Sequence, residues 1–322
     1  MGEELLDETV ARVLEVWAAM AARGEMSPQT LSRFSQLLDR FVRFARARGA
    51  VELGAVTPGI AAMFVDAHGH TRQALVAPAA PATRHLRRSV LRMFYTTARE
   101  LGLTDTDPTY GLELPPRTTG GTRPLSEDEA VALRHASEFT ERPTRHAAAA
   151  ALALAGGFSG EIGHVGPRHL DVARARVWLH GSTKTTPRWC PLDTWGLRVL
   201  TARSEHVHAA ANSLYPQEAL RLAVSPRTGN DEQIQARVCV ALRDLLKAIG
   251  LGADKRVRPA SVTAYAGAEA LAATGRIEAA ACLLGMSSLD STAALIGHDW
   301  RTADTEETTP KDGKPEEVRH AR

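Results

Sequence analysis

The stretch "LLGMSSLDSTAALIGH", Leu283 to His298, contains the most informative local pattern in this chain. It predicts the end of a helix, a turn at Gly285, a polar loop and a second short helix. A glycine stop followed by small hydroxylated residues presents side chains at a surface, as active-site segments do. Met286 and Leu295, however, stand where a reactive side chain would be useful. The stretch is therefore either a working site or only the frame of one.

Length and composition are those of a soluble globular protein. The chain has 322 residues, enough for two domains with their own cores, and is 44% hydrophobic and 24% charged. We find neither an apolar run of about 18 residues nor a signal-like N-terminus, and expect no membrane association. The three cysteines, Cys190, Cys239 and Cys282, fit neither a disulfide framework nor a zinc site. We expect a cytoplasmic protein that needs no metal or other cofactor.

The charge is unevenly distributed, although its total is only +2. Residues 1–26 hold two Arg against six acidic residues, whereas residues 27–100 hold eleven Arg against four. The chain prefers Arg to Lys throughout, but that preference does not explain the local shortage of acids. A basic segment of this kind favours an anionic partner such as nucleic acid.

Three long helices are expected in the first third of the chain, and a further short one in "VTPGIAAMFVDA" after Thr57-Pro58. Residues 5–23 form an acidic amphipathic helix, and a second helix starts with Ser27 as N-cap and Pro28 at its first position. The third, "TRHLRRSVLRMFYTTARELG", is expected to be capped by Thr83 and to end at Gly102. Its Arg84, Arg88 and Arg92 lie four residues apart and form a basic ridge, with no acid four residues away until Glu100.

A segment rich in Pro, Gly and Thr divides the chain. We expect an acidic N-terminal helix at 1–26, a helical domain at 27–112, a linker at 113–124, a second domain at 125–300 and a disordered tail at 301–322. Ser126 and Glu129 predict a capping box at the start of the second domain. An Ala-rich helix follows, and then two or three short strands in "LDVARARVWLHGSTKTTPRWCPLD".

The order of these parts resembles the tyrosine site-specific recombinases, the phage-type integrases. The similar segments are "SPQT…FSQLLDRFVRFARARG", "GTRPLSEDEAVALRHA", "LALAGGFSGEIGHVGPRHLDV", "GSTKTTPRWCPL" and "VSPRTGN…VRPASVTAYAGAEALAATG…LLGMSSLDSTAAL". They cover roughly residues 25–300, and the order is specific although each motif alone is weak. The resemblance implies a mainly α fold with a small antiparallel β-sheet: an N-terminal helical core-binding domain and a C-terminal mixed α/β recombinase-like catalytic domain.

The resemblance also implies a chemistry that can be checked residue by residue. In this family a Tyr attacks a DNA phosphodiester, two Arg with His or Trp donors stabilise the transition state, and a hairpin Lys protonates the leaving oxygen. Glu161 of the first arginine motif is in place. Most other positions carry a different residue from the one the family has. Phe158 stands at the first Arg, Ala260 and Thr263 at the His and the Arg of the His-x-x-Arg box, Met286 at the second His and Leu295 at the Tyr. Only Lys184 is a possible remnant, and no Tyr follows Tyr265.

The leading interpretation is an integrase-like protein that binds double-stranded DNA without catalysis, either as a regulator of an active recombinase or as a mobile-element remnant. Its partners would be DNA and an active recombinase or further copies of itself. The expected DNA contacts are Arg33, Arg40, Arg43, Arg84, Arg87, Arg88, Arg92, Arg168, Lys184 and Arg188. Two alternatives remain open: an active recombinase with another nucleophile, such as Ser287, Ser288 or Ser291, and a protein-interaction module that binds no DNA.

Overall fold

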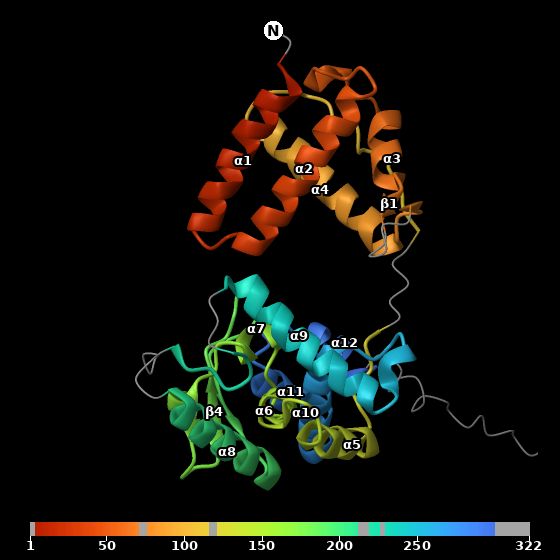
Figure 1. Cartoon of the computed structure of the whole chain (residues 1–322). Coiled ribbons are helices and arrows are strands. Elements are labelled where there is room, and N and C mark those ends of the chain that lie inside the picture. The colour runs from red at the N-terminus through yellow and green to blue at the C-terminus, as the bar shows by residue number, and fades with distance from the viewer. Residues whose placement is uncertain (1–3, 71–75, 116–120, 212–218, 226–228, 300–322) are drawn as a thin grey trace, which may run out of the picture. The chain divides into compact units, whose positions relative to one another are not determined.

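The computed structural model describes residues 4–70, 76–115, 121–211, 219–225 and 229–299 (Figure 1). The chain forms two compact units, Met1–Thr119 and Gly120–Arg322, here called unit 1 and unit 2. The predicted disordered tail, residues 301–322, lies outside the described residues.

Unit 1 consists of helices and one short hairpin. In chain order its elements are α1 (Leu6–Ala22), α2 (Pro28–Arg46), the 3-10 helix η1 (Leu53–Ala55), α3 (Pro58–Asp66), β1 (Gly69–His70), β2 (Val76–Ala77) and α4 (Pro81–Glu100).

Local sequence signals place the helix starts of unit 1. The side chain of Ser27 caps α2 by accepting a hydrogen bond from the backbone N–H of Thr30 at 3.1 Å, which confirms the expected cap. The expected start of α4 was wrong: the helix begins at Pro81 with Ala80 as N-cap, before Thr83. Proline at the first helical position has its φ already fixed in the helical range, so the helix starts there.

The acidic helix α1 is part of the core of unit 1. It packs against α2 and α4, and the buried indole N–H of Trp17 donates to the hydroxyl of Thr97 on α4 at 3.1 Å. The aromatic rings of Phe41 and Phe64 meet edge to face with centroids 5.1 Å apart. The acidic side chains of α1 therefore lie on a helix whose other face is covered by apolar neighbours.

Unit 2 is larger and contains the only sheet of more than two strands in the described part of the chain. Its elements are α5 (Glu127–Glu138), α6 (Pro143–Leu154), α7 (Ser159–Ile162), η2 (Pro167–His169), β3 (Leu170–Asp171), β4 (Arg176–Leu179), β5 (Arg188–Pro191), α8 (Thr194–Ala211), α9 (Asp231–Ala248), η4 (Leu251–Ala253), α10 (Pro259–Thr274), α11 (Ile277–Leu284) and α12 (Leu289–Ile296).

The sheet of unit 2 is an antiparallel meander in the order β3-β4-β5. Within it Val177 pairs with Cys190 and Leu179 with Arg188. Alternate residues of β5 point to opposite faces, so Arg188 and Cys190 are buried whereas Trp189 is exposed. The short strands expected in this segment are confirmed.

Helix α6 lies at the centre of unit 2, with α5, α8, α9 and α10 packed around it (Figure 1). Its residues from Ala147 to Ala153 are all buried. A helix that is apolar all round must be covered on every side. The capping box of α5 is confirmed, since the side chains of Ser126 and Glu129 each accept from the other's backbone N–H. The expected fold class, mainly α with a small antiparallel sheet, is confirmed.

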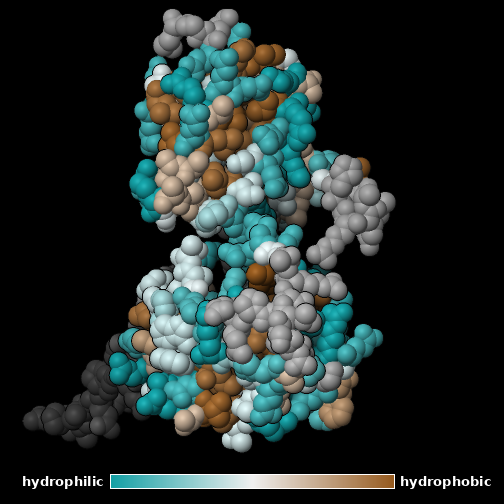
Figure 2. Space-filling model, turned by 60° about the vertical axis from the view of Figure 1, so that its left-hand side comes forward, coloured by the Kyte–Doolittle hydropathy of each residue, from teal (hydrophilic) through white to brown (hydrophobic). Residues whose placement is uncertain are grey.

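The surface of both units is mixed. On the face in Figure 2, hydrophilic and apolar residues are interspersed over the two units. In the described ranges no single helix is long and apolar enough to cross a membrane; the pair α11 and α12 passes that test only when joined across a 91° bend.

Candidate active-site region and arginine surfaces

Three of the substituted positions meet in one apolar cluster. Phe158 immediately precedes α7, Met286 follows the end of α11, and Leu295 lies on α12. All three pack against the buried side chains of Ala280, Leu284 and Ile296. The positions that the resemblance assigns to the first Arg, a His and the Tyr are thus neighbours in space, and their side chains are apolar.

The two positions of the substituted His-x-x-Arg box lie on the first turns of α10. Thr263 is buried, and its hydroxyl donates to the carbonyl oxygen of Gly157 at 2.7 Å. Ala260 is half-buried. The residue at the second arginine position therefore fixes the loop next to Phe158 and has no charge to offer a phosphate.

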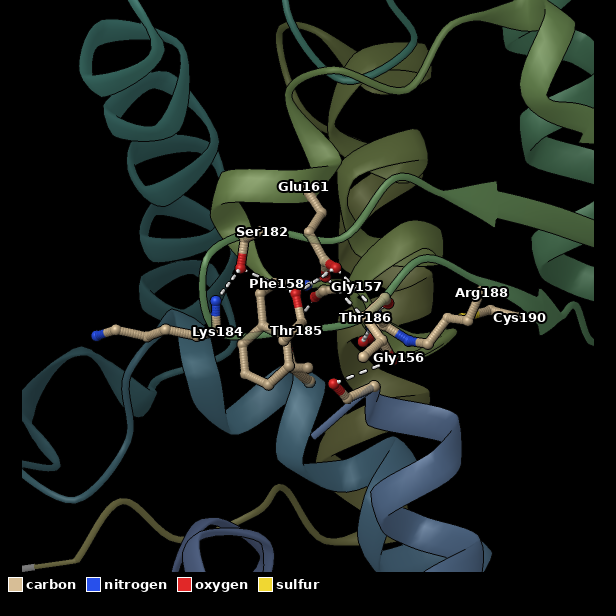
Figure 3. A network of polar contacts seen from close by, with 12 residues as sticks. Gly156, Gly157, Phe158, Glu161, Ser182, Lys184, Thr185, Thr186, Arg188 and Cys190 are labelled. Atoms are coloured by element: carbon tan, nitrogen blue, oxygen red, sulfur yellow. Dashed lines mark hydrogen bonds and ion pairs between the residues drawn. The ribbon is translucent and has the colours of Figure 1, made fainter. Parts of the chain in front are cut away.

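A buried ion pair between Glu161 and Arg188 lies beside this apolar cluster (Figure 3). The Arg188 Nη1 atom is 2.7 Å from Oε1 of Glu161, and Nη2 is 3.1 Å from Oε2. The hydroxyl of Thr185 and the backbone N–H of Phe158 also donate to this carboxylate, at 2.7 and 2.9 Å. Four hydrogen bonds hold Glu161 in place, so the carboxylate is fully occupied as a structural acceptor.

The other three hydrogen bonds that Arg188 donates are accepted by backbone carbonyl oxygens. Its Nε donates to Leu283 at 2.7 Å, Nη1 to Thr186 at 3.0 Å and Nη2 to Gly156 at 2.8 Å. A guanidinium has five N–H donors, and all five are used here. The side chain is buried and its donors have acceptors within unit 2, so the expected contact of Arg188 with DNA stays a prediction that this geometry does not favour.

Gly285 allows this arginine to approach the end of α11. It has φ of 67°, and a Cβ there would lie 2.5 Å from Nη1 of Arg188 and 2.9 Å from the carbonyl oxygen of Thr186. The Thr186 N–H in turn donates to the Gly285 carbonyl at 2.8 Å. The hairpin turn, the segment before α7 and the end of α11 are therefore joined through one arginine.

Lys184, the possible catalytic remnant, lies in the turn between β4 and β5 and is exposed. Its backbone N–H donates to the Ser182 hydroxyl at 3.1 Å. In Figure 3 its side chain points away from Phe158 and the Glu161–Arg188 pair. Lys184 is open to solvent, and its ammonium group is not directed at the substituted site.

The described tyrosines lie outside this site. The hydroxyl of Tyr265 donates to the carboxylate of Glu127, and burial, followed by this hydrogen bond, raises the Tyr265 pKa to about 12. Tyr95 is fully buried in unit 1, and burial raises its pKa as well. Tyr110 belongs to unit 1, and Tyr215 lies outside the described residues. Of the alternative nucleophiles, Ser288 is the N-cap of α12, where its hydroxyl accepts from the backbone N–H of Ser291.

Exposed arginines are found on α2 and α4 of unit 1. The ion pairs between described residues of this unit use Arg12, Arg23, Arg46, Arg84 and Arg99. The predicted DNA contacts that are exposed and take no part in these pairs are Arg33, Arg40, Arg43 and Arg92. Helical periodicity places the first three, all on α2, along one face.

The expected ridge on α4 is largely occupied by interactions within unit 1. Arg84 pairs with Asp66 of α3 at 2.5 Å, so the ridge is partly neutralised by an acid distant in sequence. Arg88 is half-buried and donates to the carbonyl oxygen of Leu112 at 3.1 Å.

Arg87, on the same helix, is buried and turned toward α3. Its Nη1 contacts the carbonyls of Phe64, Val65 and Ala67 at the end of that helix. Burial lowers the Arg87 pKa. Arg87 thus caps the end of α3, and its expected role in DNA contact stays a prediction.

The structural role of Arg188 was missed by sequence reasoning, but a signal was present. In "RWCP" the arginine and the cysteine alternate with Trp189 and so share one face of a short strand. The same alternation requires an inward Arg188. Its partner Glu161 was noted as the intact member of its motif, and the pairing could have been inferred from the two together.

The chain has the fold of the tyrosine site-specific recombinases. Three solved structures show the likeness. A lambda integrase tetramer bound to a Holliday junction has a TM-score of 0.65 at 14% identity, covering 93% of this chain and 80% of that one. Lambda integrase bound to DNA has a TM-score of 0.63 at 15% identity, covering 95% of this chain and 100% of that one. The Tn1549 transposon integrase in complex with a circular intermediate DNA has a TM-score of 0.59 at 14% identity, covering 91% of this chain and 98% of that one.

At these identities the likeness concerns the fold. No protein-family model matches the sequence, and no curated protein shows significant similarity to it. Among the described residues, no group of three or more His, Cys, Asp or Glu is arranged to hold a metal ion. The resemblance to the integrases is confirmed by the three-dimensional structure.

Proposed function

We propose that this protein binds double-stranded DNA through its integrase-like fold and does not cleave it. The observation that carries the proposal is the apolar cluster at the substituted catalytic positions Phe158, Met286 and Leu295, combined with exposed arginines on α2. Solved structures with this fold are bound to DNA. A protein of this kind would take part in DNA integration or recombination by occupying sites or by associating with an active recombinase.

The absence of strand cleavage follows from the chemistry. Removing a single donor that stabilises transition-state charge costs about 10²–10³ in rate. Here the residues at both arginine positions and both histidine positions cannot donate a charged hydrogen bond to a phosphate, and the residue at the tyrosine position cannot attack one. Such effects are not additive, but without a nucleophile no covalent phosphotyrosyl intermediate can form.

The DNA-binding part of the proposal rests on α2 of unit 1. Arg33, Arg40 and Arg43 share one exposed face of that helix. Arginine is suited to phosphate because its planar fork can donate two hydrogen bonds at once. Binding through backbone phosphates would be tight at low salt and would carry little sequence information on its own.

A salt titration of affinity for a mixed-sequence duplex tests this part. We expect a steep decrease of affinity with salt in the wild type. In an Arg33/Arg40/Arg43→Gln variant the slope should be reduced by about 0.9 for each DNA phosphate that these arginines neutralise. An Arg12→Gln variant is a suitable control, because Arg12 is an exposed arginine of unit 1 that is paired with Glu4. Affinity that is independent of salt, or equal in the wild type and the α2 variant, would refute the proposal.

Cleavage is tested separately with a nicked suicide substrate, which traps covalent protein–DNA complexes in active recombinases. We expect no covalent band after denaturing electrophoresis. A band that persists would mean that the chain uses another nucleophile, and mass spectrometry of the linked peptide would identify it.

A further inference from the structure

A polar pocket in unit 2 has no role in the proposal above. It has a volume of about 300 Å³. Cationic and imidazole side chains dominate its lining, which consists of His164, Arg168, His169, His180 and Arg221 together with Glu161 and Gly181. The side chains come from η2, the turn after β4, the segment after α7 and the segment before Ser225, all within unit 2.

The hydrogen bonds around His169 do not balance without an additional acceptor. Its Nδ1 accepts from the backbone N–H of Gly166 at 3.0 Å, so in the neutral ring the proton is on Nε2. That Nε2 lies 3.0 Å from Nε2 of His180 and 3.1 Å from Nε of Arg168. The Nε2–H can donate to the lone pair of His180, but the N–H of Arg168 then points at another donor. In this arrangement the Nε–H of Arg168 is left without an acceptor among these groups.

The titratable groups that line the pocket are mostly basic. Burial, followed by the charges of His180, Arg168 and Arg221, lowers the pKa of His169 to about 4. Burial, then Arg168, His164 and Arg221, lowers the pKa of His180. Of the nearby acids, Glu161 is neutralised by Arg188, and Asp231 on α9 is almost fully exposed, 3.6 Å from His164. The lining is therefore rich in basic side chains and in N–H donors.

We propose that this pocket binds a phosphate group, with Arg168 and the pair His169 and His180 donating to its oxygens. A tetrahedral oxyanion supplies several acceptors at once, among them the one that the Arg168 N–H lacks. The phosphate comes either from a nucleic-acid backbone or from free phosphate. The site is distinct from the apolar cluster at Phe158, Met286 and Leu295. Binding of a free anion does not depend on the proposed function.

Because two imidazoles line this site, we expect its affinity for an anion to depend on pH. A bound dianion favours the protonated form of His169 and His180, so binding takes up protons and strengthens as the pH falls. Sulfate is the better probe for this effect, because unlike phosphate it does not change its own charge near neutrality.

The experiment is calorimetric titration of the full chain with sodium sulfate and with inorganic phosphate between about pH 7.5 and about pH 5.5. We expect binding that strengthens toward low pH and weakens about tenfold or more in an Arg168→Gln/His180→Asn variant. An Arg174→Gln variant is the control, because that arginine is 71% exposed and lies outside the pocket. No binding of either anion by the wild type, or equal binding by both variants, would overturn the proposal.

Two further measurements keep the test independent of variant folding and identify the source of the phosphate. In the unmodified protein, sulfate should shift the side-chain ¹⁵N resonances of His169 and His180; unchanged resonances at saturating sulfate would refute the site. Duplex DNA that displaces sulfate assigns the pocket to a backbone phosphate, whereas sulfate binding that persists in saturating DNA assigns it to free phosphate. If DNA does not bind but sulfate does, the proposed function fails and the pocket remains.

Discussion

The arginines of α2 in unit 1 point to solvent, whereas Arg188 on β5 in unit 2 is turned inward and has every donor occupied. Both were equally plausible phosphate contacts in the sequence. The difference lies in their partners: Glu161 and three carbonyl oxygens meet Arg188, while Arg33, Arg40 and Arg43 share no ion pair with a described acid. An arginine is free to bind DNA only if the fold has not already used its charge.

The largest expected effect comes from breaking the inward arginine. Arg188→Met leaves Glu161 buried and uncompensated, and we expect the free energy of unfolding of unit 2 to fall by about 3–5 kcal/mol. Urea unfolding followed by tryptophan fluorescence measures this. Arg33→Met on α2 is the matched control, expected to stay within about 0.5 kcal/mol of the wild type.

A double variant sharpens this prediction. In Glu161→Leu/Arg188→Met both charges are replaced by apolar groups, and we expect a smaller destabilisation than in Arg188→Met alone. A double variant as unstable as the single one would mean that the hydrogen bonds of Arg188 to carbonyls, and not its charge pair, stabilise the region.

The second effect concerns the apolar cluster. Restoring charge with Phe158→Arg and Met286→His places polar groups among Ala280, Leu284 and Ile296, and we expect a destabilisation of about 1–3 kcal/mol. Differential scanning calorimetry measures the change in Tm. Val131→Arg, at a residue 52% exposed, should leave the Tm unchanged. A Tm that stays the same or rises in the double variant would show that the site has not closed.

The third effect is a pH dependence of stability. The pKa of His169 is held at about 4, below the 6.5 of an ordinary histidine, so the unfolded chain binds its proton at higher pH than the folded one. The free energy of unfolding should therefore fall as the pH drops from about 6.5 toward about 4. His169→Gln should flatten this decline in urea titrations at several pH values, whereas His208→Gln, at an exposed site, should not. An equal decline in both variants would contradict the assignment.

The smallest effect distinguishes the two helices of unit 1. Arg84/Arg88→Gln removes arginines already engaged by Asp66 and by the Leu112 carbonyl. We expect it to lower DNA affinity less than Arg33/Arg40/Arg43→Gln does, with a correspondingly smaller change of salt slope. Fluorescence anisotropy at fixed salt compares the two. A larger decrease in affinity from the α4 variant would mean that these arginines leave their protein partners when DNA binds.

The apolar cluster itself was largely predictable. The motif order aligned Phe158, Met286 and Leu295 with the positions of the catalytic residues, and the structure brings the three together. The sequence could assign these positions because local markers lie beside them, Glu161 for the first and the glycine turn before Met286 for the second. The set of residues that lines the polar pocket was not predictable from the sequence. His169 and His180 are on different elements, and they meet only through the pairing of the strands.

The sequence by itself determined the helix starts at Ser27 and Ser126, the order of the parts, and the absence of a tyrosine at Leu295, since these depend on neighbouring residues or on residue type alone. The tertiary structure alone decided which arginines remain available. Arg84 meets Asp66, Arg87 meets the end of α3, and Arg188 meets Gly156 and Leu283. Those partners lie 18 to 95 residues away along the chain, so local sequence patterns carry no information about them.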